Sequence, residues 1–411
     1  MKIFFIFLLS SFIFSSEQVF VVCEGNYGSN NSSLWTINNE DVNEYYNNPL
    51  GDVAQSVLVN GNQLFVILNV SSNIQVFDIT DDGLIPTHII DTDLSGPREM
   101  LVYENYLYFT NWYTADIKKI NLLTWQIESE ISMPGLPEDI IYFDGFIYSS
   151  INMNIDWSDG SLVVKVDPST NMIVHEYEVG LGPGNLLEHE GEIYIARTYY
   201  DENWNAFSGT SKISDNDDVL IVNYGGALPC GGSVLSYDGS VYRAYDGGIA
   251  MLDSNLEIMP DMRIGDYDYN SIYSVEIIGD YIYFGLTDYL TPDDVKVVDF
   301  NGDEIASYEV GVLPGDFAVW NSCNNNGDVS NDGIVNIIDI VGIVNAILDG
   351  ENYNCTADLN LDDLVNILDV IQLVQEILEI DSFRGAANWV QKHFPQIKVN
   401  ERIKKALRHS Q

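Results

Sequence analysis

The sequence predicts a mainly β fold made of repeated antiparallel sheets, followed by a small helical module. Three observations predict it. A strand–turn–strand pattern recurs along most of the chain, and an oxygen-rich loop of twelve residues occurs twice near its end. The composition, with 32 Gly and 25 Tyr, favours strands and turns. A hydrophobic fraction of 46% argues against wholesale disorder.

Residues 1–16 have the pattern of a secretory signal peptide. Lys2 precedes a mostly apolar run, Ile3–Phe14, and Ser15-Ser16 offers small residues for cleavage. The run is about 12 residues long, which is too short for a membrane-spanning helix. We therefore expect a secreted or cell-surface protein with no transmembrane span after processing; a membrane-anchored N-terminus is the alternative.

The repeat occupies residues 17–320. Each copy has a Pro or Gly turn, an apolar strand, a Gly or Asn turn, and a strand rich in Tyr and Phe, as in Gly96–Phe109, Leu136–Tyr148 and Gly182–Tyr194. Weaker copies centre on Gly61, Gly239 and Gly279, so the turns recur every 40–48 residues. That period, with several strands in each unit, is typical of a β-propeller.

Two further strands follow in each unit, and the ends of the region complement each other. Ile74–Asp78 and Leu162–Asp167 are apolar third strands, and Ile173–Val179 is a more polar fourth strand. Inner strands should be apolar on both faces, whereas the outermost should alternate. Leu313–Trp320 is a first strand without a second, and Val19–Gly25 a second without a first. Pairing them closes the ring and gives seven blades.

The opening segment Phe20–Gly28, with Ser33-Leu34, resembles the start of exported bacterial YVTN-type, surface-layer-like propellers. The resemblance implies a binding module, with a glycan, a peptide or a protein as ligand. Such propellers are binding modules more often than enzymes.

Charge excludes one class of partner and draws attention to two residues. With 17 Lys and Arg against 62 Asp and Glu, the net charge is −45, which argues against nucleic acid. Cations are scarce in the repeat region. Arg197 and Arg243 follow equivalent strands and fall on the same strand face. We expect them to line the channel and hold an anionic ligand, or else to form salt bridges.

Residues 328–339 and 358–369 form two similar loops of twelve residues. Oxygen side chains stand at positions 1, 3, 5, 9 and 12, and position 7 offers its carbonyl, a spacing that wraps a chain around Ca²⁺. The loops predict two Ca²⁺ ions, held by Asp328, Ser330, Asp332, Ile334, Asn336 and Asp339, and by Asp358, Asn360, Asp362, Leu364, Asn366 and Asp369. Asp363 replaces the turn glycine of the first loop, Gly333, which should weaken the second site.

Each loop leads into an apolar helix, predicted over Ile340–Leu348 and Val370–Leu378. This duplicated loop–helix, residues 323–380, resembles a type I dockerin. The resemblance implies EF-hand-like Ca²⁺ loops and docking onto a cohesin-like or other extracellular protein. The family's partner-reading positions carry apolar residues here, Ile337, Ile338, Ile367 and Leu368. Packing within the same protein is an alternative role for them.

The cysteines and the C-terminal tail complete the organisation. Cys323 and Cys355 precede the two loops at similar offsets, so an exported chain could bridge them. The pairing of Cys23 and Cys230 stays open. We divide the rest into a linker, 321–327, a calcium-binding module, 328–380, and a basic amphipathic tail, 381–411.

The sequence contains no nucleophile elbow, HExxH motif or P-loop. We therefore expect an exported binding protein, whose propeller recognises a glycan, peptide or protein and whose Ca²⁺-loaded module tethers it to an extracellular assembly. The alternative is a polysaccharide-degrading hydrolase or lyase, which the dockerin resemblance also allows.

Overall fold

The structure is a computed structural model. Its described residues are 17–38, 41–45, 50–80, 83–226 and 232–321, and then 327, 329–330, 335–349, 355–359, 365–374 and 377. The chain divides into two units, one of Ser16–Trp320 and one of Met1–Ser15 with Asn321–Gln411. The predicted signal peptide, the basic tail and most of the linker lie outside the described residues.

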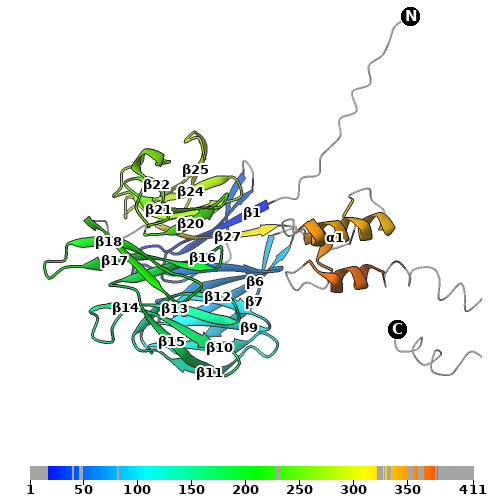
Figure 1. Cartoon of the computed structure of the whole chain (residues 1–411), viewed down its shortest axis with the longest axis horizontal. Helices are drawn as coiled ribbons and strands as arrows, with labels where there is room; N and C mark the ends of the chain where they lie inside the picture. The colour runs from blue at the N-terminus through cyan, green and yellow to red at the C-terminus, as the bar shows by residue number, and fades with distance from the viewer. Residues whose placement is uncertain are drawn as a thin grey trace, which may run out of the picture. The chain divides into compact units, whose positions relative to one another are not determined.

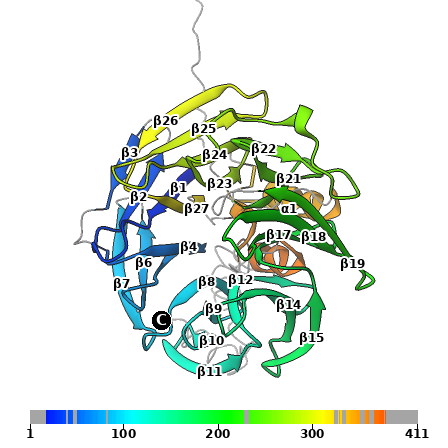
Figure 2. The same cartoon turned by 90° about the vertical axis from the view of Figure 1, so that its left-hand side faces the viewer.

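The larger unit is a seven-bladed β-propeller, as the repeat predicted (Figures 1 and 2). Six sheets have four strands and one has three. The first three sheets are β27 (Pro314–Asn321), β1 (Glu17–Cys23), β2 (Ser33–Asn38) and β3 (Asp41–Glu44); β4 (Ala54–Asn60), β5 (Gln63–Leu68), β6 (Asn73–Thr80) and β7 (Gly83–Asp91); and β8 (Pro97–Tyr103), β9 (Tyr106–Asn111), β10 (Asp116–Asn121) and β11 (Gln126–Ser132).

The other four follow in chain order. They are β12 (Leu136–Phe143), β13 (Phe146–Met153), β14 (Asp159–Asp167) and β15 (Met172–Glu178); β16 (Pro183–His189), β17 (Glu192–Tyr200), β18 (Ala206–Ile213) and β19 (Val219–Gly226); β20 (Val234–Tyr237), β21 (Ser240–Tyr245) and β22 (Gly248–Met251); and β23 (Ile272–Ile278), β24 (Tyr281–Leu286), β25 (Asp294–Asp299) and β26 (Glu304–Glu309).

The ring closes as the sequence predicted. The last strand of the propeller, β27, lies beside the first, β1, and both belong to the sheet that continues through β2 and β3. Residues of β1, β5 and β27 pack in one apolar cluster, so the closing sheet shares a core with its neighbour. Closure removes the two open sheet edges that an unclosed array would expose.

Burial follows strand position. In β5 and β9 every residue after the first is buried, because these second strands lie between neighbouring blades. The outermost strand β11 alternates between exposed and more buried positions, as predicted. The first strands depart from the prediction: Arg98 and Glu99 of β8 are polar and only partly buried. First strands surround the axis of the ring, so one of their edges meets the channel instead of a neighbouring blade.

The sheet β20–β22 lacks a fourth strand. After β22 the chain makes isolated bridges, Ile249↔Ile264 and Leu252↔Ile258, and a 3₁₀ turn, Pro260–Met262. Pro260 has no N–H to donate to a ladder, which helps to explain why a regular strand does not form. This irregular segment replaces the fourth strand of the repeat.

The two ends of the ring differ in their loops. We call the end that carries the connections between second and third strands the loop face, and the end that carries the tight turns between first and second strands the turn face. Exposed aromatic residues stand on five of the seven second-to-third connections: Tyr27 (78% exposed), Tyr113 (60%), Trp157 (54%), Trp204 (80%) and Tyr289 (44%).

The C-terminal unit contains a helix, α1 (Ile337–Asp349), a 3₁₀ turn, η2 (Cys355–Ala357), and helical residues 367–374 and 377 (Figure 1). Both helices start three residues before the predicted positions. A buried apolar cluster that includes Ile343, Leu359 and Leu373 joins them. Among the described residues, no helix is long and apolar enough to cross a bilayer.

Candidate functional site

Arg197 and Arg243 are exceptional among the cations of the propeller. The sequence places nine Lys and Arg residues between 17 and 320. In the structure five of them, Arg98, Lys118, Lys212, Arg263 and Lys296, form salt bridges. Lys119 and Lys165 lie over aromatic rings. Arg197 and Arg243 are each only 2% exposed, and neither pairs with a carboxylate of the described residues.

Arg197, on β17, is held by backbone and amide oxygens. Its Nη2 donates to Val222 O at 2.8 Å and to Asn223 Oδ1 at 2.6 Å, and its Nη1 donates to Leu181 O at 3.3 Å. A Cβ on Gly209 would lie 2.2 Å from Nη2, so the guanidinium fits only because that residue is glycine. Burial lowers the pKa of Arg197.

Arg243, on β21, is less well satisfied. Its Nη2 donates to Arg197 O at 3.2 Å, whereas its buried Nη1 has no hydrogen-bond acceptor among the described residues. The guanidinium lies 5.8 Å from the ring centre of Tyr224. Burial lowers the pKa of Arg243 to about 10, and the nearby Arg197 adds to this effect. A buried charged donor without an acceptor destabilises the fold, so a ligand that offered Nη1 an acceptor would remove this cost.

Arg243 lines a pocket of about 820 Å³ between the sheets β16–β19 and β20–β22. Thr198 and Ser208 come from the first of these sheets, and Tyr245 and Asp246 from the end of β21. The wall formed by Gly247 and Gly248 is bare backbone: a Cβ on Gly247 would lie 2.0 Å from Tyr267 O, and one on Gly248 2.2 Å from Ile264 O. The irregular segment that replaces the fourth strand therefore packs directly behind this wall.

The pocket belongs to the loop face. Trp204, from the connection between β17 and β18, and Tyr269, from the connection that precedes β23, both line it and are 80% and 51% exposed. The structure brings the two arginines together, and it places them on second strands beside this pocket. The first strands, which surround the axis of the ring, are other segments of the chain.

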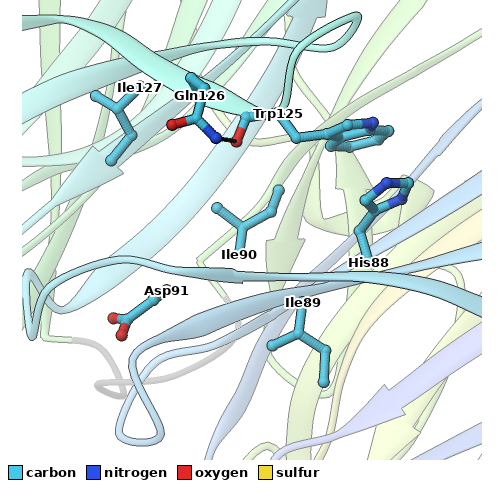
Figure 3. A pocket seen from close by; sticks show the side chains of 7 residues that line it. All are labelled: His88, Ile89, Ile90, Asp91, Trp125, Gln126 and Ile127. Carbon is cyan, nitrogen blue, oxygen red and sulfur yellow. Dashed lines mark hydrogen bonds between the residues drawn. The ribbon is translucent and has the colours of Figure 1, made fainter.

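A second cavity, of about 380 Å³, lies between the outer strands β7 and β11 (Figure 3). His88 stacks on Trp125 with ring centres 3.9 Å apart, and Ile89, Ile90 and Ile127 supply apolar walls. The side chain of Gln126 turns back onto Trp125 O at 3.2 Å. The one carboxylate that lines it, Asp91, is exposed and accepts the N–H of Asp93 at 2.9 Å, so this cavity offers no buried charge for recognition, unlike the pocket beside Arg243.

First strands carry acidic residues that sequence reasoning missed. Arg98 forms a bidentate pair with Glu138, at 2.6 and 3.1 Å, and lies 4.3 Å above the ring of Trp112. Burial raises the pKa of Glu24 to about 7 and that of Asp316 to about 6. The signal was present in the repeat itself, as a Pro followed two residues later by an acid in Pro97–Glu99, Pro137–Asp139 and Pro314–Asp316.

Some of these acids connect neighbouring blades. Asp316 Oδ2 accepts the N–H of Val57 at 2.8 Å, and Asp139 Oδ2 accepts the N–H of Leu186 at 2.6 Å. Asn185 Oδ1 accepts the N–H of Val234 at 2.9 Å in the same manner. Burial also raises the pKa of Asp139 to about 6, although these N–H donors oppose the change.

In the described parts of the two predicted Ca²⁺ loops, the aspartate at position 12 accepts the N–H of position 9, whereas its second donor is position 3 in the first loop and position 2 in the second. In the first, Asp339 accepts the N–H groups of Ser330 and Asn336 at 2.8 and 2.7 Å. In the second, Asp369 accepts those of Leu359 and Asn366 at 2.9 and 2.8 Å. Both aspartates are fully buried.

Asn336 and Asn366 cap the helices that follow. Asn336 Oδ1 accepts the N–H of Ile338, and Asn366 Oδ1 that of Leu368, both at 2.8 Å. Each asparagine with the aspartate three residues later forms a reciprocal capping arrangement. Positions 3, 9 and 12 of the first loop are thus joined by hydrogen bonds from the backbone of Ser330 and Asn336 to Asp339.

Several predicted residues lie outside the described part of the chain: Asp328, Asp332, Ile334, Asn360, Asp362 and Leu364, and also Cys230 and Cys323. Within the described residues no group of three His, Cys, Asp or Glu side chains could hold a metal ion. Since half of the predicted ligands fall outside that part, the Ca²⁺ sites stay predictions. The Cys323–Cys355 bridge likewise stays a prediction, and Cys23 is a buried free thiol.

The four predicted docking residues are exposed at the starts of the two helices. The exposed fractions are 69% for Ile337, 57% for Ile338, 61% for Ile367 and 55% for Leu368. Within the described residues these side chains are not part of the apolar cluster between the helices.

Comparison with known proteins shows the fold alone. No family model and no curated protein sequence matches the chain. A protein of unknown function from Desulfotomaculum acetoxidans is similar in structure, with a TM-score of 0.54 and 12% identity over 74% of this chain and 98% of that one. Hydrazine synthase of Kuenenia stuttgartiensis has a TM-score of 0.52 and 12% identity over 64% and 88%. The computationally designed Ika8 protein has a TM-score of 0.50 and 14% identity over 74% and 93%.

Proposed function

We propose that this chain is an exported binding protein whose propeller holds an anionic ligand on its loop face. The observation that supports the proposal is the buried Arg243, with its unused Nη1 donor, in the wall of an 820 Å³ pocket. Ligand sites are mostly preformed cavities of about 300–1,000 Å³ with a few convergent polar groups. In a chain with 62 acids, a buried arginine without an acid is a site where the ligand supplies the negative charge.

The second part of the proposal concerns the C-terminal module. It would bind two Ca²⁺ ions and tether the propeller to a cohesin-like or other extracellular protein. Ser330, Asn336 and Asp339 of the first loop, and Asp358, Asn366 and Asp369 of the second, would be among the ligands. The hydrogen bonds that Asp339 and Asp369 both accept from position 9 support this part, and the exposed Ile337, Ile338, Ile367 and Leu368 would face the partner.

Glycan and peptide arrays probed with the full chain in Ca²⁺ test the proposed binding function. We expect binding to anionic members, and its loss in Trp204→Ala, which removes an 80% exposed ring at the pocket. Leu123→Ala is the matched control, because Leu123 is 75% exposed but lies on the turn face. A chain that binds no member, or a Trp204→Ala variant that binds as well as the wild type, would contradict the proposed site.

One observation favours the alternative, a polysaccharide-degrading hydrolase or lyase. Glu24 has a pKa raised to about 7 by burial, as a general acid working near neutral pH requires. Glu24→Gln would then abolish polysaccharide cleavage, measured as release of reducing ends, without reducing ligand binding. Absence of cleavage by the wild type would leave binding as the function.

A further inference from the structure

We propose that the pocket beside Arg243 binds an acidic sugar through a single carboxylate, as in a uronic acid. This inference rests on the proposed binding function and names the ligand class for the same pocket.

The charged side chains of the pocket favour a ligand with one carboxylate. Arg243 is the only cation among the residues that line the pocket, and the sole acid there, Asp246, already pairs with Arg263 at 3.2 Å. Arg197 adjoins Arg243, because the carbonyl oxygen of Arg197 accepts a hydrogen bond from Arg243 Nη2. The side chain of Arg197 is also buried and adds a second positive charge. The forked donors of a guanidinium match the geometry of carboxylates and phosphates, and of these two a carboxylate carries the smaller charge.

The rest of the ligand must be largely uncharged. The propeller is strongly acidic, and carboxylates such as Glu24, Glu138 and Asp316 lie at its first strands or next to them. A polyanion would be repelled by this surface, whereas a ligand with one isolated carboxylate meets only the buried arginines. A saccharide with one acidic residue satisfies both conditions.

The lining favours a sugar over a peptide side chain. Four aromatic residues, Trp204, Tyr224, Tyr245 and Tyr269, offer flat faces, and Thr198, Asn205 and Ser208 offer hydroxyl and amide groups. Among the described residues, Ile272 is the only branched aliphatic residue in the lining. A pyranose presents C–H groups to aromatic rings and hydroxyls to small polar groups, and this lining supplies both kinds of partner.

The test compares two probes that differ at one carbon. Methyl β-D-glucuronide carries a carboxylate at C6, and methyl β-D-glucoside carries a neutral CH₂OH there. Each is titrated into the full chain with Ca²⁺ and followed by NMR. We expect the glucuronide to bind at least about tenfold more tightly, the preference that one charge-assisted hydrogen bond supplies.

Two variants separate the charge from the stacking surface. Arg243→Gln should reduce the preference for the glucuronide to near unity, with folding checked by circular dichroism. Trp204→Ala is exposed enough to leave folding intact, and it should weaken both probes by a similar factor. Arg243→Lys should retain part of the preference, because the charge stays but the fork is lost.

Three results would overturn the inference. They are equal affinity for the two probes, no binding of the glucuronide at millimolar concentration, and binding of an N-acetylated dipeptide with a free C-terminal carboxylate in place of the glucuronide. In the last case the binding function and its site would stand, and only the ligand class would be wrong. Failure of the array experiment would instead remove the binding function itself.

Discussion

Two arginines of the propeller show opposite ways of keeping a guanidinium inside a protein. Arg98 has a bidentate carboxylate, an amide oxygen from Gln55 and the face of Trp112. Arg243 has one backbone carbonyl, a distant tyrosine ring and a donor without an acceptor. Since a buried ion without compensation destabilises the fold by several kcal/mol, Arg243 is a residue where stability has been given up, which is common at binding sites.

Glu276 gives a prediction for the pH dependence of stability. Burial raises its pKa to about 7, and the carboxylate of Asp316 adds to the shift, whereas an unfolded glutamate titrates near 4.3. The folded state therefore holds the proton more tightly. The contribution to stability is complete below about pH 4 and is lost as the pH rises through about 7.

Glu276→Gln should remove this dependence. We expect the variant to be more stable than the wild type at about pH 8, by on the order of 1 kcal/mol or more, and no more stable at about pH 4. Urea denaturation at the two pH values measures the difference. Glu128→Gln, on the outer strand β11, is the control and should not change the pH dependence. A Glu276→Gln gain of the same size at both pH values would show that charge is not the cause.

At the scale of elements, single side chains join neighbouring blades at the inner strands. Asp139 connects β12 to β16, Asn185 connects β16 to β20, and Asp316 connects β27 to β4. In each case an oxygen of one first strand satisfies the backbone N–H of the next first strand, in addition to the apolar packing between sheets.

A pair of substitutions at Asp139 tests this connection. Asp139→Ala leaves the N–H of Leu186 without its acceptor and should destabilise the propeller by about 1–3 kcal/mol. Asp139→Asn keeps an acceptor and removes a buried charge, so it should be neutral or stabilising at about pH 8. Urea titrations of the two variants and the wild type give the free energies of unfolding to be compared. Equal losses in the two variants would show that the charge, and not the acceptor, matters.

The repeat made most elements predictable, because each inner strand carries its own apolar pattern and its own turn. The missing fourth strand after β22 was not predictable from the period, since it depends on how residues 252–267 pack against Gly247 and Gly248. The arginines were singled out by their scarcity and strand register. Their pocket was not, because its walls come from loops that are distant in sequence. The acids of the first strands, such as Asp139 and Asp316, could not be singled out from the sequence, because it contains 62 Asp and Glu residues.

At the scale of the whole molecule, the two units should respond differently to chelation. Without Ca²⁺ the clustered carboxylates of residues 328–369 repel one another, so EDTA should unfold the C-terminal module. We expect the helical circular dichroism signal to fall while the thermal transition of the propeller stays unchanged. Calorimetry should show two Ca²⁺ ions bound per chain. In the Asp358→Asn variant, which loses a predicted ligand of the second loop, it should show fewer. An unchanged helical signal with no heat of Ca²⁺ binding would contradict the assignment.

The net charge of −45 predicts a dependence on salt. Self-repulsion among exposed acids destabilises the compact state, and salt screens it over about 10 Å at 0.1 M. The melting temperature of the propeller should therefore rise from low to high NaCl. The same melting temperatures measured in potassium glutamate separate charge screening, which both salts provide, from a specific effect of chloride. A melting temperature that stays level or falls would show that repulsion does not limit stability.

The sheet that closes the ring has a consequence for biogenesis. Among the strands of the propeller, β1 is synthesised first and β27 last, yet they are neighbours in one sheet. A nascent chain must hold an unpaired edge until the ribosome has passed residue 320, so the ring cannot finish folding as it emerges. A chaperone could shield the unpaired edge of β1 during synthesis. A circularly permuted chain that begins at β4 would synthesise β27, β1, β2 and β3 in succession and should fold with a shorter delay.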